Sequence, residues 1–481
     1  MKNVTSMEQF TVPNIEAEVI RRRDMRNVFT FTIDPKDAKD FDDALSFNVE
    51  EDGTFQVGVH IADVTFYVQP NTDLDKSAYQ KATSIYYVDH VLPMLPEELC
   101  NDLCSLRPNE DKLTMSVIFT IDPESCNSNM PLRILKHKIC RTVIRSNFRL
   151  AYEDAQNILD TVPQITAKRR QKDGKKTAKG ADPNEMLSEA LHTLNEMAIQ
   201  LRRERMKNGA LDIEQEELQF ELDENKHPVK IIFHKPTAAN HLIEEFMLLA
   251  NRTIATEMGK RGHEFVYRVH DKPDHEKLEQ VCTFQKRFGD TIPASVIEML
   301  TIRAMAKAVY DTKNIGHYGL AFDYYTHFTS PIRRYPDMMV HRLVSKFILG
   351  ERTRGAVAPQ DLKEACLHCS EMEQFAQQEE RDSVKQMQTI WMADHLGEEF
   401  DGTIVNVTDF GLFIRLDDNC CEGLIHITDL VKDDYMLYDS KNFRLIGERT
   451  GKTFTIGDRL HVKLTRADID KKQIDFELVT P

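Results

Sequence analysis

Near the start of the chain, hydrophobic and polar positions alternate with a period of two. Residues 28–33, VFTFTI, predict a strand that Asp34-Pro35 ends. Similar runs at 44–49 and 55–61 flank Glu51-Asp52-Gly53-Thr54, where Asp-Gly supplies the positive φ of a hairpin turn. We therefore expect a β-hairpin within a sheet in this region.

The middle of the chain changes to helical spacing. Leu187, Leu191, Leu194, Ala198 and Leu201 predict a long amphipathic helix that stops at Asn208-Gly209. Helical patterns then dominate from about 239 to 395, including all of ASVIEMLTIRAMAKAVY at 294–310. An aromatic stretch around 318–328 interrupts them.

From Gly397 onward the pattern returns to short alternating strands separated by Gly, Asp and Asn turns. The strands are GTIVNV, GLFIRL, GLIHI, RLHVKLT and QIDFELV. We expect an α+β fold in which a mixed sheet with many helices over 1–395 is followed by a small all-β, OB-type barrel over 396–481.

One segment lacks the apolar side chains that a core needs. Residues 166–180, TAKRRQKDGKKTAKG, hold seven Lys or Arg against one Asp and no large hydrophobe. We interpret 166–182 as an exposed, flexible, basic insertion.

Composition narrows the class of protein. A chain of 481 residues with 41% hydrophobic residues predicts about two to four folded units. The net charge of −16 argues against sequence-blind coating of nucleic acid by the whole surface, although a channel can still be locally basic. With no apolar run of about 18 residues, no signal-peptide core and nine cysteines without framework spacing, we expect a cytoplasmic protein with reduced thiols and no membrane segment.

The densest candidate for chemistry is an acidic cluster directly after the first predicted strand. Residues 34–43, DPKDAKDFDD, place five carboxylates in ten residues, and hard divalent cations such as Mg²⁺ relieve such repulsion by taking oxygen ligands. A solvated acidic turn would explain Asp37, but it explains poorly why Phe41 and Ala44 interrupt the run. A calcium-binding EF-hand fails, because Lys39 stands where that motif needs Gly.

Around this cluster, TIDPKDAKDFDDA resembles the RNB domain of the ribonuclease II/R family, particularly its bacterial members. The resemblance continues through further motifs over nearly the whole chain, and the tail from Gly397 resembles an S1 domain. The motifs are HIADV at 60–64, VLPMLP at 91–96, DLCSL at 102–106, NGALD at 208–212, IEE at 243–245, RVHDKP at 268–273 and TSPIRRYPD at 329–337.

The resemblance implies a hydrolytic, processive 3′ to 5′ exoribonuclease that degrades single-stranded RNA to nucleoside 5′-monophosphates. It implies that Asp34, Asp40, Asp42 and Asp43 are the active-site aspartates and metal ligands, with Asp42 also catalytic, and that Asp37 is not among them. We expect Mg²⁺, as one or two ions, with Mn²⁺ as a possible substitute.

Further site residues follow from matched motifs. Arg333 corresponds to the catalytic arginine of the family, and Arg334 beside it is a candidate RNA-binding residue, since a guanidinium can hold phosphate oxygens bidentately. Glu380 corresponds to a glutamate near the scissile phosphate. An ion pair with a local acid is the alternative for either arginine, and a solvated helix face is the alternative for Glu380.

The resemblance also implies contacts to the RNA itself. Tyr86 is the candidate for an aromatic that stacks on a terminal base and sets the final product length, with core packing as the alternative role for it and for Tyr87. Glu244 or Glu245 resembles a carboxylate that contacts ribose, where a hydrogen bond to the 2′-hydroxyl would discriminate against DNA.

In the predicted barrel, Phe410, Phe413 and His426 fall where S1 domains display rings to single-stranded RNA. Barrel-core packing is the alternative for one of the two phenylalanines. Residues 397–481 carry 11 Lys or Arg against 17 Asp or Glu, so this part alone should bind RNA weakly. Cys366-Leu-His-Cys369 is not interpreted as a zinc site, because it has no partner pair and lies in a predicted helix.

Family members usually carry two cold-shock domains ahead of the RNB region, and some carry a basic tail. Neither is present in this sequence, so the chain is either a fragment of a longer protein or a naturally short version. We expect a monomer that binds single-stranded RNA. The competing hypothesis is a catalytically inactive RNA-binding remnant, which would have little reason to keep all four aspartates together with Arg333.

Overall fold

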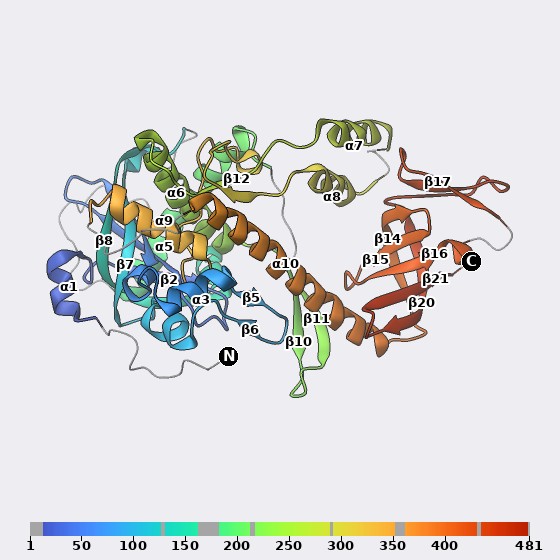
Figure 1. Ribbon diagram of the computed structural model, residues 1–481, viewed down its shortest axis with the longest axis horizontal. Helices are drawn as coiled ribbons and strands as arrows, with labels where there is room; N and C mark the ends of the chain where they lie inside the picture. The colour runs from blue at the N-terminus through green and yellow to red at the C-terminus, as the bar shows by residue number, and fades with distance from the viewer. Residues whose placement is uncertain are drawn as a thin grey trace.

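The computed structural model describes residues 13–126, 130–161, 182–211, 217–288, 292–351, 361–430 and 434–479. They form a large α+β body and a small β-barrel, and the long helix α10 (Leu362–Ala393) runs from one to the other (Figure 1). The α+β fold with a terminal barrel expected from the sequence is confirmed. The predicted basic insertion lies outside the described residues except for Asp182, which caps the next helix.

The body is built on one mixed sheet with strand order β1-β8-β7-β4-β3-β2-β9. The pairs β1 with β8 and β2 with β9 are parallel, and the other neighbours are antiparallel. The predicted hairpin is confirmed, with Gly53 at φ +84 in its turn. The strands are β1 (Arg23–Asp24), β2 (Thr30–Asp34), β3 (Asp43–Val49), β4 (Phe55–Ala62), β7 (Asp111–Ile121), β8 (Ile134–Arg145) and β9 (Phe148–Ala151).

Helices cover the sheet and extend toward the barrel. The predicted long helix is confirmed, and it ends at Lys207, before Gly209 at φ +97. Besides α10, the helices of the body are α1 (Ile15–Arg21), α2 (Val64–Tyr67), α3 (Asp73–Lys81), α4 (Tyr152–Asp160), α5 (Pro183–Lys207), α6 (Ala238–Arg261), α7 (His275–Phe288), α8 (Ala294–Ala304) and α9 (Tyr335–Phe347), with a π-helical turn at Glu98–Leu103.

The helical reading of 294–310 is wrong in its second half. Helix α8 ends at Ala304, and Val309–Asp311 forms β13, which pairs antiparallel with β12 (Tyr267–Val269). The helical spacing of apolar residues continues past Ala304, but Tyr310 is buried there through strand pairing and contacts to α10. Tertiary contacts have overridden the local pattern.

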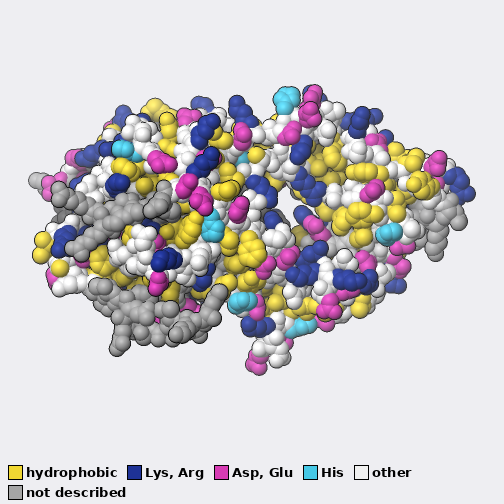
Figure 2. Space-filling view, viewed as in Figure 1, with side chains coloured by type: hydrophobic (Ala, Val, Ile, Leu, Met, Phe, Trp, Pro, Cys, Tyr) yellow, Lys and Arg dark blue, Asp and Glu magenta, His cyan; other side chains and the backbone are white. Residues whose placement is uncertain are grey.

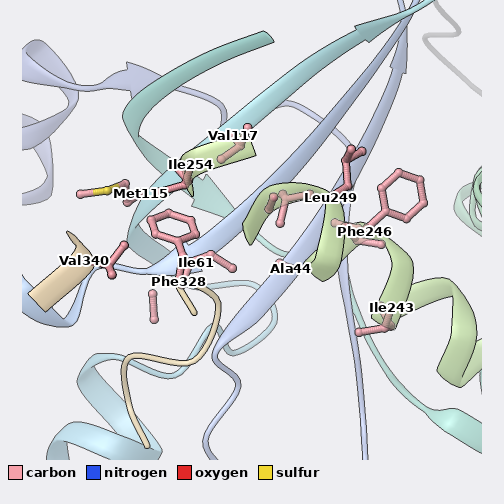
Figure 3. Packing of buried hydrophobic residues seen from close by; sticks show 14 of the residues in the cluster. Ala44, Ile61, Met115, Val117, Ile243, Phe246, Leu249, Ile254, Phe328 and Val340 are labelled. Atoms are coloured by element: carbon pink, nitrogen blue, oxygen red, sulfur yellow. The ribbon is translucent and has the colours of Figure 1, made fainter. Parts of the chain in front are cut away.

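The core of the body lies between the sheet and the helices that pack on it. Helix α6 contributes an almost wholly buried face, and Figure 3 shows its side chains beside those of the central strands. The labelled residues of this core are Ala44, Ile61, Met115 and Val117 from the sheet, Ile243, Phe246, Leu249 and Ile254 from α6, and Phe328 and Val340 from the segment around α9. This packing fixes the ends of β2 and β3, where the acidic cluster begins and ends.

The tail forms the closed barrel β14-β15-β16-β21-β20, in which every predicted tail strand is found. Its strands are β14 (Glu399–Thr408), β15 (Gly411–Leu416), β16 (Glu422–His426), β20 (Arg459–Asp468) and β21 (Gln473–Leu478), with α11 at Ile427–Leu430. Besides the pair β12–β13, three small sheets in the described part of the chain were not predicted. They are β17 (Met436–Asp439) with β18 (Arg444–Gly447) and β19 (Thr453–Thr455), the hairpin β10 (Glu217–Leu222) with β11 (Pro228–His234), and the hairpin β5 (Ile85–Tyr86) with β6 (Val91–Leu92).

The barrel is attached to the body by apolar packing as well as by the chain itself. Val296, Leu300 and Ala304 of α8 and Met392 of α10 belong to one buried cluster with the barrel core. The viewed face in Figure 2 is hollowed between the body and the barrel. Within the described ranges, no helix combines the length and the apolar character needed to cross a bilayer.

Candidate active site

The acidic cluster connects two neighbouring strands of the large sheet. Asp34 is the last residue of β2 and Asp43 is the first residue of β3. We call residues 34–43 the aspartate loop. Phe41 is 6% exposed, and its backbone N–H donates to Ser105 Oγ at 3.0 Å, so the interruption of the acidic run by an apolar residue reflects anchoring to the core. Asp37, which was not expected in the site, is exposed.

The four candidate aspartates are held in a poorly solvated place. Burial is the main cause that raises the pKa of Asp34, Asp40, Asp42 and Asp43, and for Asp43 the pKa reaches about 7. Mutual repulsion adds to the effect, because Asp43 and Asp40 further raise the pKa of Asp34. These carboxylates therefore resist ionisation unless positive charge is supplied.

Two carboxylate oxygens of the cluster make no hydrogen bond within the described part of the protein. Asp34 Oδ2 and Asp43 Oδ2 are buried without a hydrogen-bond partner, whereas buried polar groups are usually paired. Oxygen donors of this kind suit a hard divalent cation, so the chemistry of the residues fits a metal. As they stand, no three acidic, histidine or cysteine side chains in the described part of the chain are arranged to hold one ion.

Arg333 faces the aspartate loop from a distant segment, Thr329–Arg334, which we call the arginine loop. The backbone N–H of Ile332 donates to Asp42 Oδ1 at 2.9 Å, across 290 residues of sequence. Arg333 Nε lies 3.8 Å from Asp42 Oδ2, and its Nη2 donates to Ser330 Oγ at 3.1 Å. Its side chain remains 42% exposed, so it keeps donors available beside the aspartates.

Arg334 is not brought to the same place. Its Nε donates to Asp337 Oδ1 at 3.0 Å and its Nη2 to Asp337 Oδ2 at 2.8 Å, in a bidentate pair beside the start of α9. Asp337 is fully buried and also accepts from Ser330 N–H at 2.8 Å. The ion-pair alternative thus describes Arg334, and Asp337 emerges as a residue that orders the arginine loop. Its place in the first helical turn behind Pro336 is the signal that could have suggested this role.

Tyr86 and Glu380 lie side by side, close to Arg333. Tyr86 lies in the hairpin β5 (Ile85–Tyr86) and β6 (Val91–Leu92), and its backbone N–H donates to Glu380 Oε1 at 3.1 Å. Burial, with added repulsion from Asp40 and Asp42, raises the pKa of the Tyr86 hydroxyl, so it stays neutral. Burial likewise raises the pKa of Glu380, against the opposing effect of Arg333. Tyr86 as a residue is 39% exposed, so a ligand can reach part of it.

The rest of the hairpin is tied to α10 by residues that sequence reasoning did not single out. Tyr87 turns away from the aspartates, donates its hydroxyl to Glu379 Oε2 at 2.9 Å and stacks on His90 with ring centroids 4.6 Å apart. The backbone N–H of Val88 donates to Ser383 Oγ at 3.0 Å. Glu379, Glu380 and Ser383 of α10 therefore hold the hairpin β5–β6, and we call these three residues the clamp. The sequence signal for the clamp was spacing along one predicted helix, because residues three and four positions apart share a face.

The glutamate pair on α6 is divided between two environments. Glu245 is 2% exposed and accepts from Arg205 Nη2 at 2.6 Å, and burial raises its pKa. The side chain of Glu244 is 43% exposed and lies 3.3 Å from Arg205 Nη2. Glu244 is thus the member of the pair that a ligand can reach.

The three candidate residues of the barrel lie together, far along the chain from the aspartates. Phe410 is 46% exposed, and its ring lies edge-on to that of Phe413 with centroids 6.0 Å apart. His426 pairs with Gly411 across β15 and β16, and its Nδ1 lies 2.8 Å from Thr428 Oγ1. Neither phenylalanine belongs to the buried barrel core, so the core-packing alternative does not hold for either ring.

Cys366 and Cys369 are buried in the body core, and His368 Nε2 lies 2.8 Å from the carbonyl oxygen of Tyr79. The motif is part of continuous helix α10, as predicted. These side chains serve packing and helix docking.

Comparison with known protein families identifies two domains in the chain. Residues 22–350 match the RNB domain, and residues 394–478 match the S1 RNA binding domain. The chain belongs to the RNB-domain family. The resemblance inferred from the ordered motifs is thereby confirmed. The aspartate loop, the arginine loop and the hairpin β5–β6 that carries Tyr86 all lie within residues 22–350.

Similar proteins share the sequence and the fold over nearly the whole chain. Ribonuclease R of Aquifex aeolicus is 37% identical over 96% of this chain and 66% of its own length. This chain therefore spans slightly less than two thirds of that relative. The structure of Mycoplasma genitalium RNase R in complex with ribose methylated single-stranded RNA has a TM-score of 0.86 and 28% identity, covering 98% of this chain and 74% of that one.

A further structure shows how widely the fold is used. Yeast Ssd1, a pseudonuclease, has a TM-score of 0.67 and 19% identity, covering 91% of this chain and 54% of that one. At this level of identity the likeness concerns the fold alone. Activity must therefore be argued from the site residues rather than from the architecture.

Proposed function

We propose that this protein is a hydrolytic, processive 3′ to 5′ exoribonuclease that degrades single-stranded RNA to nucleoside 5′-monophosphates. The observation that carries the proposal is the aspartate loop, with four carboxylates of raised pKa and two buried, unpaired oxygens beside Arg333. Burying such a cluster of carboxylates costs folding free energy unless a bound cation compensates for it. The likeness to ribonuclease R proteins supports RNA as the substrate.

Asp34, Asp40, Asp42 and Asp43 are the residues that would hold the divalent cation, Mg²⁺ with Mn²⁺ as a substitute, as one ion or two. A bound cation would neutralise the phosphate and favour ionisation of the attacking water. Asp42 is fixed by the N–H of Ile332 at Oδ1, which leaves Oδ2 to accept a proton or a ligand. Because the pKa of Asp43 is about 7, a cation that binds near neutral pH would displace a proton from this carboxylate.

Arg333 and Glu380 act on the phosphate that is cleaved. The exposed guanidinium of Arg333 is positioned to donate to phosphate oxygens and to stabilise the charge that develops as the 3′-oxygen leaves. Glu380, whose pKa is raised by burial, lies beside Arg333 and is placed to exchange a proton close to the leaving oxygen. Arg334 supports this arrangement through Asp337 rather than through RNA.

The remaining residues bind the RNA chain without reading its sequence. The ring of Tyr86 is placed to stack on a terminal base, which suits a substrate of any sequence. Glu244 is the member of the α6 pair that is available for a ribose 2′-hydroxyl. Phe410, Phe413 and His426 would receive single-stranded RNA on the barrel. A monomer in the cytoplasm remains our expectation.

The competing hypothesis is an RNA-binding remnant without activity. It would need the same barrel residues, but it would have no use for unpaired buried carboxylate oxygens, which are unfavourable in the absence of a cation. The aspartate loop therefore favours the enzyme over the remnant.

End-labelled single-stranded RNA and DNA, incubated separately with Mg²⁺ and with chelator, test the proposal. We expect release of nucleotides from the 3′ end of RNA with Mg²⁺, no release with chelator, and little degradation of DNA. RNA that binds and stays intact with Mg²⁺ or Mn²⁺ would establish the remnant instead.

A further inference from the structure

One arginine of the body reaches the barrel at the strand that borders its aromatic residues. Arg303 stands in the last turn of α8, and its Nη1 lies 3.4 Å from both the carbonyl oxygen of Val405 and Asn406 Oδ1 on β14. Both hydrogen bonds are long. Arg303 is solvent-accessible, and among the described residues its Nε and Nη2 donate to no protein acceptor.

Strand register places this arginine beside the candidate RNA face. Asn406 pairs directly with Phe413, which in turn pairs with Leu424 of β16. Leu412 and Ile414 on either side of Phe413 point into the barrel core, so Phe413 and its cross-strand neighbours point outward. Arg303 therefore meets the outer surface next to the ring of Phe413.

The charge on this surface makes the position unusual. The tail from 397 to 481 has a net charge of −6, which disfavours RNA binding. Arg415, two residues along the same strand from Phe413, is neutralised by Glu422, with N–O distances of 2.6 and 2.9 Å. In the part of the chain that the structure describes, Arg303 has no carboxylate within ion-pair distance. Burial lowers the pKa of Arg303, and the nearby Glu422 opposes this effect in part.

The arginine is held at this place by the core beneath it. Leu300 and Ala304, which lie one turn before Arg303 and directly after it, are buried in one cluster with Ile404 and Val407 of β14. Its backbone therefore has a fixed position relative to the barrel strands. The entropy lost when Arg303 binds a ligand is therefore limited to that of its side chain.

We propose that Arg303 binds the phosphodiester backbone of single-stranded RNA and completes the RNA face of the barrel. The face is then shared between domains: the barrel supplies rings for the bases through Phe410, Phe413 and His426, and the body supplies the cation. The barrel and α8 thus form one composite entry site for the 5′ part of a long substrate. This inference rests on the proposed function in one respect, that single-stranded RNA is the ligand.

The test is the salt dependence of RNA binding, measured in chelator so that no cleavage occurs. Arg303→Gln should weaken binding of a long single-stranded RNA by about fivefold at low salt, and it should reduce the slope of log affinity against log salt by about 0.7, the value for one phosphate contact on a single strand. Arg303→Lys should keep most of the slope. A short oligonucleotide that reaches only Tyr86 and the aspartate loop should bind the parent, Arg303→Gln and Arg303→Lys equally.

Arg287→Gln is the matched control. Arg287 of α7 also reaches across to the tail, where its Nη1 donates to Asn442 Oδ1 at 2.9 Å, but it contacts the turn between β17 and β18 rather than the face with Phe413. Removing this charge should leave the salt slope unchanged. An equal loss of slope in both variants would show only a general charge effect and would overturn the proposal.

Melting temperatures separate binding from structure. Arg303→Gln should melt close to the parent temperature, because it loses only two long hydrogen bonds. The proposal is overturned if the parent binds long RNA but Arg303→Gln binds it with unchanged affinity and slope. Failure of the parent to bind RNA would refute the proposed substrate itself, which is a distinguishable result.

Discussion

At the scale of single residues, the site depends on carboxylates that the fold keeps away from water. Asp42 is 5% exposed and Asp34 and Asp43 each carry a buried oxygen without a partner, yet a neighbouring guanidinium is only 3.8 Å from Asp42. One arginine does not compensate four buried carboxylates. A cation bound here would favour their ionised forms, interact strongly with them and attract phosphate.

The raised pKa of Asp43 predicts a pH dependence of stability. The pKa of Asp43 is about 7 in the folded protein and 3.8 ordinarily, so the folded state binds this proton more tightly than the unfolded state. In chelator, the contribution of Asp43 to the free energy of unfolding should therefore fall as the pH rises from about 4 to about 7. Burial lowers the pKa values of His60, His317, His327 and His341, so these groups contribute in the opposite direction. Calorimetry should therefore measure the effect of Asp43 as the difference in melting temperature between the parent and Asp43→Asn, and Mg²⁺ should offset the loss at about pH 7.5.

Asp43→Asn is the control for this measurement. It removes the titrating group, so the melting temperature of the parent relative to that of the variant should be higher at about pH 5.5 than at about pH 7.5, and the variant should respond less to Mg²⁺. Identical pH profiles for the two proteins would mean that Asp43 ionises normally in the folded state.

Tyr86 allows a separate prediction at the same scale. Tyr86→Ala should lengthen the final product and leave degradation of long RNA nearly intact, because one stacking contact is worth roughly 1–3 kcal/mol and matters most when few nucleotides remain bound. Gel analysis of end products measures this. An unchanged ladder for Tyr86→Ala would exclude its ring from the site and make Tyr87 the next candidate.

At the scale of elements, helix α10 connects the functional parts of the molecule. Its middle holds the hairpin of Tyr86 through Glu379, Glu380 and Ser383, and its last turns pack into the barrel cluster. The hairpin has only two short strands, which are marginal by themselves. The clamp by α10 therefore determines where Tyr86 stands.

Ser383→Ala tests the clamp. The substitution removes the acceptor for the N–H of Val88 and should cost about 1 kcal/mol locally. We expect a broader distribution of final products with an unchanged melting temperature and unchanged affinity for long RNA. A product distribution as narrow as that of the parent would indicate that the hairpin holds its own shape.

What the sequence could predict at this scale depended on whether the information was local. Alternation identified β2, β3, β4 and the barrel strands, and spacing identified α5, because those patterns reflect one buried face. The strand β13 was taken for helix, and an ion pair with a local acid was only the alternative for Arg334, without Asp337 being named as its partner. Motifs named Asp34 to Asp43, Arg333 and Glu380, but their convergence depends on contacts such as Ile332 to Asp42 across 290 residues, which no local pattern encodes.

At the scale of the whole molecule, cleavage and capture are assigned to different places. The aspartate loop lies in the body, whereas Phe410 directly precedes β15 of the barrel and Phe413 lies on it; the body and the barrel form opposite ends of the molecule (Figure 1). A long RNA can use both places, whereas a short one can use only the first. Substrate length should therefore separate the two functions.

Phe410→Ala combined with Phe413→Ala should weaken binding of long RNA by up to about 2–6 kcal/mol, the stacking energy of two bases, while degradation of a short oligonucleotide is unchanged. Filter binding and product release on RNAs of two lengths measure the difference. Equal losses on both lengths would show that the substitutions disturb the body, and no loss on either would remove these rings from the RNA face.

The most direct test of the central claim is nucleotide release by Asp42→Asn under single-turnover conditions with Mg²⁺. The amide oxygen can still accept the N–H of Ile332, so the aspartate and arginine loops should keep their arrangement. An amide is a weaker ligand and cannot take up a proton, and losses of several kcal/mol in transition-state stabilisation are typical of such sites. We predict near-complete loss of release with RNA affinity retained. Release at close to the parent rate would contradict the account of the aspartate loop as the catalytic centre.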